Sequence, residues 1–118
     1  MDIETFTTIC LTKKGVTQSF PFGGDTLVFK VMGKMFALTG LDSVPATANL
    51  KCDPEWANEL REIYEDIQPG FHMNKAHWNT VTLEGRVEDN LVRKLIDHSY
   101  ELVVVSLPKK EKELLALL

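Results

Sequence analysis

The stretch DTLVFKVMGKMFALTGL, residues 25–41, decides the fold. Its apolar side chains alternate across 27–31, which predicts a strand whose two faces differ. Met32-Gly33 then predicts a tight reversal, because glycine accepts the positive φ that hairpin turns demand. Residues 34–41 are the expected partner strand. A β-hairpin therefore forms the centre of the predicted structure.

Towards the N-terminus, apolar residues near a 3.6-residue period predict a helix over 2–13, with Gly15 beyond its end. Residues 17–22 read as a short strand. On the other side of the hairpin, a loop containing Pro45 leads to a further predicted strand at 46–51. The first half of the chain is thus expected to be one helix followed by a strand meander.

The clearest boundary lies at Asp53 and Pro54, because aspartate caps helices and proline suits the first helical position. An apolar stripe follows, made by Trp56, Leu60, Ile63 and Tyr64. We expect Trp56 and Leu60 to be largely buried. The stripe predicts an amphipathic helix that Gln68-Pro69-Gly70 ends.

The last third is expected to hold extended segments at 71–73 and 79–83, then a helix over 88–104 that buries Leu95. Pro108 begins a last short helix. Helices and strands that occur in separate runs favour an antiparallel sheet over a parallel one. The predicted class is therefore α+β, an antiparallel sheet of about four or five strands packed against helices, in a single domain spanning 1–118.

Composition excludes several protein classes. The 118 residues are 44% hydrophobic and 25% charged, as in globular domains. No apolar run approaches the roughly 20 residues that span a bilayer, and the acidic start at residues 1–4 is unlike a secretory signal. Cys10 and Cys52 lack ligand spacing and are expected to be reduced and buried. The expected protein is a cytoplasmic monomer or small oligomer with no membrane contact.

The net charge of −4 is unevenly distributed. Six acidic residues and one arginine lie within residues 53–66, which gives that segment −5 and leaves the rest of the chain at +1. Excess lysine and arginine usually accompany nucleic-acid binding. The segregation permits a basic face elsewhere but does not by itself support one.

Several stretches together are similar to a known family. They are the segments FPFGGDTLVFKV (20–31), NLKCDP (49–54), PGFHMNKAHWNTV (69–81), DHSY (97–100) and LPKK (107–110). In order and spacing they resemble the MmcQ/YjbR family over nearly the whole chain. The resemblance implies a frataxin-like (CyaY-like) fold and the label DNA-binding that members commonly carry.

The segment 72–79 has the most varied chemistry. Its lysine suits a phosphate, its asparagines suit phosphate or base edges, and its tryptophan suits stacking on a base. With nearby lysines, the candidate nucleic-acid residues are Lys75, Asn74, His77, Trp78, Asn79, Lys51 and Lys30. In the alternative interpretation Trp78 and His72 pack in the core and 74–76 is a solvated turn. The phenylalanines at 20, 22, 29 and 36 are expected to be core aromatics of the sheet.

The predicted helix within 53–66 offers a different function. Glu55, Glu59 and Glu62 line one helical face, which suits either a protein partner or, with less support, a hard cation. His72 and His77 are five apart, a spacing that fits neither one helix face nor one strand face. No catalytic motif or phosphate loop is present. We therefore expect a binding module without enzymatic activity, metal or cofactor.

Overall fold

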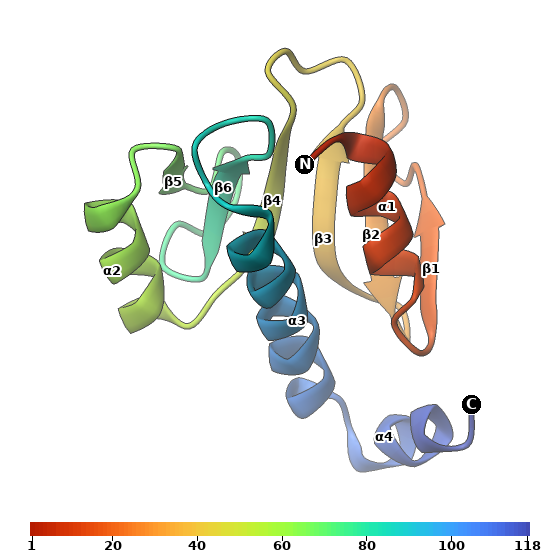
Figure 1. The fold of residues 1–118 in the computed structure, drawn as a ribbon. Coiled ribbons are helices and arrows are strands. Elements are labelled where there is room, and N and C mark those ends of the chain that lie inside the picture. The colour runs from red at the N-terminus through yellow and green to blue at the C-terminus, as the bar shows by residue number, and fades with distance from the viewer.

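The chain folds into one antiparallel sheet with helices on one of its faces (Figure 1). A computed structural model describes all residues, 1–118. The elements in chain order are α1 (Ile3–Leu11), β1 (Val16–Ser19), β2 (Thr26–Val31), β3 (Lys34–Gly40), β4 (Thr47–Lys51), α2 (Pro54–Ile63), β5 (Ile67–Pro69), β6 (Trp78–Thr82), α3 (Asp89–Ser106) and α4 (Lys109–Ala116). None of the helices combines the length and hydropathy needed to cross a membrane.

The six strands lie in the order β1-β2-β3-β4-β6-β5, and every neighbouring pair is antiparallel. The first four strands follow one another as a meander. After α2 the chain adds β5 at the edge and then inserts β6 between β4 and β5. The α+β class and the antiparallel sheet are confirmed, but the sheet has six strands instead of four or five.

The central hairpin forms as its sequence predicts. Met32 and Gly33 have φ values of 49° and 79°, the left-handed conformations that a two-residue turn between right-twisted strands needs. The register shifts beyond the turn, since Lys30 pairs with Met35 but Phe29 pairs with Ala37. Phe36 is the extra residue of this bulge, and both Phe36 and Ala37 join the main core.

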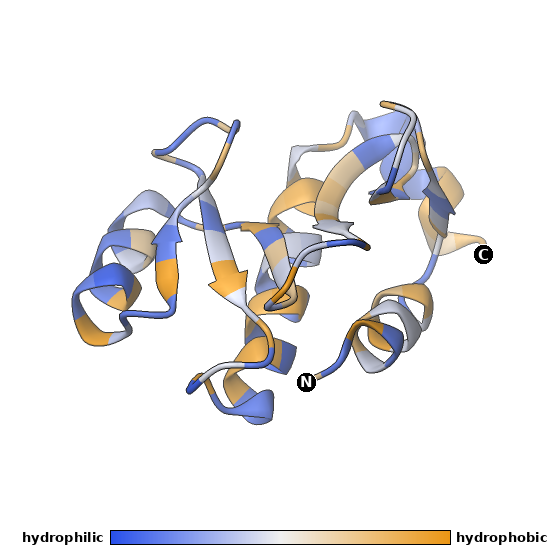
Figure 2. Cartoon of the chain, turned by 90° about the horizontal axis from the view of Figure 1, so that it is seen from above, coloured by the Kyte–Doolittle hydropathy of each residue, from blue (hydrophilic) through white to orange (hydrophobic).

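The main core lies between the sheet and its helices. Figure 1 shows α1 and α3 crossing in front of the strands, and the view from above in Figure 2 places α1, beside the N label, on one side of the sheet. Sheet and helix side chains in this core are almost completely buried, among them Phe29, Phe36 and Leu50 of the strands, Phe6 of α1 and Ile96 of α3. In Figure 2 the helices carry orange segments next to blue ones, as expected of helices with one buried face.

The predicted helix start at Asp53 is confirmed, because its carboxylate accepts a hydrogen bond from the Trp56 backbone N–H at 3.2 Å. The predicted stripe of α2 is only partly buried. Leu60 is buried and Trp56 is half-buried against the core, whereas Ile63 is 70% exposed. Ile63 is the last residue of the helix, and its side chain lies largely in solvent.

Two predicted strands are misplaced. The strand expected at 17–22 is β1 at Val16–Ser19, and its last predicted residues form a turn instead. The extended segment expected at 71–73 is also a turn, and the edge strand β5 lies earlier, at Ile67–Pro69. Proline is tolerated in β5 because this strand has a hydrogen-bonded neighbour on one side only.

Candidate functional site

The face of the sheet opposite the helices is open. Alternation and register place Val28, Leu38, Asn49, Thr80 and Gln68 in one row across five strands. The apolar members Val28 and Leu38 pack with Trp78 in a small cluster separate from the main core. Met35 and Met73 cover that cluster, and no helix residue contributes to it. We call this surface the open face.

The charge of the sheet has one sign. No strand residue is acidic, and the basic strand residues are Lys30, Lys34 and Lys51. None of the three takes part in an ion pair of the protein. Lys30 pairs with Met35 and Lys51 with Trp78, so both lysines flank the apolar cluster on the open face. The carboxylates instead belong to helices, caps and loops.

A hollow of about 440 Å³ lies at the end of the open face away from these lysines. It is lined by residues of four strands and three loops, namely Phe22, Thr26, Leu38, Thr39, Gly40, Ser43, Thr47, Asn49, Phe71, His72, Met73 and Thr80. The lining contains hydroxyl, amide, imidazole and aromatic groups but no carboxylate, lysine or arginine. The hollow therefore combines apolar surface with hydrogen-bonding groups and carries no permanent charge.

Asn49 and Thr80 lie on the floor of this hollow and hold the backbone of Phe71, at its rim, by hydrogen bonds. The Phe71 N–H donates to Thr80 Oγ1 at 3.0 Å, and Thr80 Oγ1 in turn donates to Asn49 Oδ1. Asn49 Nδ2 donates to the Phe71 carbonyl at 3.3 Å. The Phe71 backbone is thus held on both sides while its side chain stays 59% exposed. The next residue, His72, has a φ of 61°, a conformation uncommon outside glycine.

The loop at 70–77 is held in place from the helical side. Arg61 of α2 donates to Asn79 Oδ1 at 2.7 Å, to the Trp78 carbonyl at 3.2 Å and to the Lys75 carbonyl. Within the loop, Lys75 Nζ donates to the Gly70 carbonyl at 2.8 Å. One arginine therefore orders the backbone of the segment predicted to contact nucleic acid.

The structure brings some of the predicted residues together and separates others. Lys30 and Lys51 share the open face with Trp78, but Trp78 is 8% exposed and packs in the small apolar cluster, so it is not available to stack on a base. Asn74, Lys75 and His77 are exposed in the hairpin loop beside it. Asn79 lies on the covered face, where it is 3% exposed and bonded to Arg61, so it has no access to a ligand.

Two of the four phenylalanines that the sequence assigns to the core are exposed instead. Phe29 and Phe36 are buried as expected, but Phe20 is 47% and Phe22 is 68% exposed. The signal was available, since Phe22 and Phe71 each lie next to a glycine in a turn rather than inside an alternating strand. Asn49 was missed as well, although its place between buried Ala48 and Leu50 puts it on the opposite face of β4.

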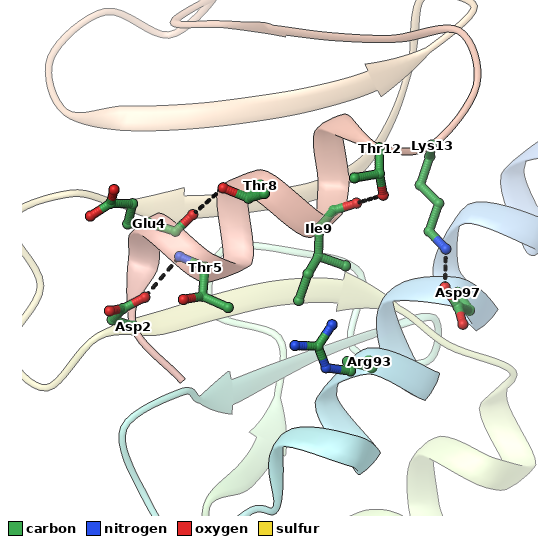
Figure 3. A pocket seen from close by; sticks show the side chains of 9 residues that line it. All are labelled: Asp2, Glu4, Thr5, Thr8, Ile9, Thr12, Lys13, Arg93 and Asp97. Atoms are coloured by element: carbon green, nitrogen blue, oxygen red, sulfur yellow. Dashed lines mark hydrogen bonds and ion pairs between the residues drawn. The ribbon is translucent and has the colours of Figure 1, made fainter.

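A larger hollow, of about 610 Å³, lies between α1 and α3. Figure 3 shows Arg93 of α3 reaching towards α1 without a partner, while Lys13 pairs with Asp97 at one end. The lining also includes Asp2 and Glu4, and Ile9 is its one hydrophobic residue. Three carboxylates against two cations disfavour a polyanion here, and a lining with one hydrophobic residue and no aromatic ring offers no stacking surface for a flat aromatic ligand.

Neither cysteine is in the thiolate form that nucleophilic chemistry requires. Burial raises the pKa of Cys10 to about 12 and that of Cys52 to about 11, so both thiols are protonated at neutral pH. No group of three or more His, Cys, Asp or Glu side chains is placed to hold a metal ion. On α2, Glu55, Glu59 and Glu62 are all exposed and form no ion pair.

Relatives with similar sequences are bacterial. The chain is 36% identical to the uncharacterised protein YjbR of Escherichia coli (strain K12) over 116 residues, which are 98% of each chain. It is 40% identical to the uncharacterised protein YbdF of Escherichia coli O157:H7 over 111 residues, 93% of this chain and 90% of the relative.

Among solved structures, a DUF419 domain protein from Deinococcus radiodurans matches with a TM-score of 0.91 and 39% identity, covering 97% of this chain and 87% of that one. A Pseudomonas syringae protein matches with a TM-score of 0.76 and 28% identity, over 86% of this chain and 98% of that one. The YjbR family model matches residues 11–102, most of the chain. The chain therefore belongs to the YjbR family.

Proposed function

We propose that this protein is a non-enzymatic binding module that holds single-stranded nucleic acid weakly on its open face. One observation carries the proposal: the open face combines unpaired lysines, exposed aromatic side chains and a complete lack of strand carboxylates. Proteins that bind single strands combine positive charge for the backbone with aromatic groups on which bases stack.

The distribution of charge supports this reading despite the net −4. The acidic residues of α2 belong to a helix, and none of them lines the hollow or joins the apolar cluster of the open face. Exposed charges more than about 10 Å apart are largely screened at 0.1 M salt. The remaining repulsion, together with the small number of lysines, leads us to expect weak affinity that falls steeply with salt.

The shape of the site favours a single strand over a duplex. A duplex is usually read by an element that enters its groove. The loop at 70–77 is poorly suited to that role, because Lys75 Nζ bonds back to the loop and Arg61 holds its backbone. Along β4, Thr47 at the hollow and Lys51 are four residues apart, or about 13 Å. Unpaired bases and the phosphates of one strand can therefore contact both ends of the open face.

The test is a titration with a single-stranded oligonucleotide of about eight nucleotides at low and moderate salt. The double variant Lys30→Glu/Lys51→Glu should weaken binding at least tenfold at low salt. A matched control, Lys94→Glu/Lys110→Glu, makes the same charge change on α3 and α4, which contribute no residue to the hollow or the apolar cluster of the open face. Equal losses in both variants would mean that only the global charge matters, and no salt-sensitive binding by the wild type would refute the proposal.

A second candidate function, a protein interaction through α2, is favoured by one observation. Ile63 is 70% exposed on a helix whose Glu55, Glu59 and Glu62 are exposed and unpaired. An apolar side chain beside carboxylates suits a partner with a basic, partly apolar surface. A photo-crosslinking residue at position 63 should then give a defined protein adduct in cells. The same residue at Val105 of α3, which is 68% exposed, is the control and should give none.

A further inference from the structure

The hollow lies on the same open face as the lysines, but its own lining carries no permanent charge. Its lining holds no positive side chain that would anchor a phosphate or carboxylate. It also holds no negative side chain that would attract a cation. Its hydroxyl, amide and imidazole groups disfavour a purely aliphatic ligand, because such a ligand would leave buried polar groups unpaired. A neutral, flat ligand with hydrogen-bonding edges satisfies all three conditions.

We propose that this hollow receives one unpaired nucleobase. In this proposal the base belongs to the single strand that the open face binds, so it rests on the function proposed above. The volume of about 440 Å³ is at the lower end of small-ligand sites, which suits a single ring system with its sugar outside. The phosphates on either side of the base would lie along the open face, towards Lys51 and Lys30.

The walls of the hollow supply stacking surfaces. Phe22 belongs to the turn before β2, and Phe71 belongs to the loop before β6, so the two aromatics approach the hollow from different sides of β3 and β4. They are 68% and 59% exposed, which is unusual for phenylalanine unless the side chain contacts something outside the fold. Stacking of a base on either ring would bury this apolar surface.

The floor supplies hydrogen-bonding groups with unused capacity. Asn49 Oδ1 accepts one hydrogen bond from Thr80, and Asn49 Nδ2 donates one of its two hydrogens to the Phe71 carbonyl. One donor and one acceptor position of the amide therefore remain free. A carboxamide that offers a donor and an acceptor together can pair with the edge of a base, as asparagine does with adenine.

The backbone at the rim supports a ligand role. His72 lies next to Phe71 with a φ of 61°, and the hydrogen bonds of Phe71 to Thr80 and Asn49 hold the segment in that conformation. Strained residues persist where the surrounding structure fixes them, and they are concentrated at ligand-binding sites. Four features, namely neutrality, exposed aromatics, a free amide edge and local strain, thus coincide in one hollow.

The experiment uses three probes with the full chain: an oligoadenylate of about eight nucleotides, an abasic sugar–phosphate chain of equal length, and free adenosine. Binding is followed by fluorescence anisotropy for the chains, and by NMR signals of Phe71, His72 and Asn49 for all three probes. The wild type should bind the oligoadenylate roughly tenfold or more tightly than the abasic chain, because stacking one base has an effect of that size. Phe71→Ala and Phe22→Ala should each reduce this ratio.

Phe20→Ala is the matched control, because Phe20 is exposed but does not line the hollow, and it should leave the ratio unchanged. Equal affinity for the base-containing and abasic chains would overturn the nucleobase pocket while leaving the lysine-based function intact. If neither chain binds but adenosine shifts the signals of the hollow, the pocket stands with a free nucleoside as its ligand, and the proposed function fails. If no probe has an effect, both proposals are refuted.

Discussion

The two faces of the same sheet differ in what covers them. On the covered face, Phe29, Phe36 and Leu50 are buried beneath α1 and α3 in a cluster of 24 buried residues. On the open face, Val28, Leu38 and Trp78 form a cluster of three, covered only by methionines and a loop. One set of strands therefore provides a large hydrophobic core on one side and a small, partly polar surface on the other.

Because the two faces differ in this way, the residues that stabilise the fold are largely separate from those that we propose bind a ligand. The covered face contributes most of the buried apolar area, so the fold does not depend on what the open face displays. The open face is therefore able to carry lysines, an amide and exposed aromatic rings at little cost in stability. An antiparallel sheet allows this division because alternate residues of each strand point to opposite faces.

The largest expected effect is on the covered face. Leu95 of α3 is buried in the main core, and Leu95→Ala should lower the free energy of unfolding by about 2–5 kcal/mol, because the truncation leaves a cavity between α3 and the sheet. Urea denaturation measures this change. A loss below about 1 kcal/mol, far under that range, would mean that α3 is packed loosely and that the two faces differ less than described.

The second-largest expected effect is at Arg61 of α2, which is hydrogen-bonded to Asn79 on the covered face and to the loop beside the open face. Arg61→Ala removes the hydrogen bonds from α2 to Asn79 and to the Trp78 and Lys75 carbonyls, and it leaves buried Asn79 without that partner. We expect a loss of about 1.5–3 kcal/mol in unfolding free energy, as for other hydrogen bonds to charged groups. Hydrogen exchange should quicken in the loop at 70–77 more than in β2. Uniform changes in exchange would contradict a local role for Arg61.

The same truncation on the open face should be milder. Leu38→Ala removes apolar atoms from the small cluster, but the site lies at the hollow, where water fills the vacated space. Without the cavity contribution we expect about 1–2 kcal/mol from the lost burial. The direct comparison is the difference in urea midpoints between Leu38→Ala and Leu95→Ala. Equal losses would show that the open face belongs to the core as fully as the covered one.

The smallest effect is a pH dependence at the contact between α2 and α3. His98 Nε2 accepts the Asp53 N–H at 3.0 Å, and its ring lies edge-on to Trp56 with 4.7 Å between centroids. Burial lowers the pKa of His98 below its usual 6.5, although the Asp53 carboxylate partly opposes the shift. The unfolded chain therefore takes up this proton first as the pH falls below about 6.5, and the contribution to stability decreases until the folded pKa is passed.

His98→Gln keeps a hydrogen-bond acceptor without a titrating group and is the matched comparison for this effect. The wild type should lose stability relative to the variant as the pH falls from about 7 to about 5, measured by thermal or urea unfolding. Parallel pH profiles for the two proteins would show that His98 does not couple protonation to folding. Such a result would leave the comparison of the two faces unchanged.

Local patterns predicted the elements whose causes are local. The turn at Met32-Gly33, the cap at Asp53 and the long amphipathic helix α3 all depend on residues within a few positions of each other. The strand β5 was missed because its three residues have no period of their own and are defined by pairing with β6. Phe22 was placed in the core because the predicted strand was extended as far as residue 22. The two glycines that follow it are the local signal for the turn in which it is exposed.

The sequence by itself determined the α+β class, the antiparallel hairpin, the helix boundaries and the family, because each is encoded in spacing along the chain. Only the tertiary structure decided which sheet face stays open, that Lys30 and Lys51 share it, and that Asn79 turns inward to Arg61. These features depend on contacts between segments far apart in sequence. Alternation assigns a side chain to one of two faces, but the packing of the helices determines which of those faces meets solvent.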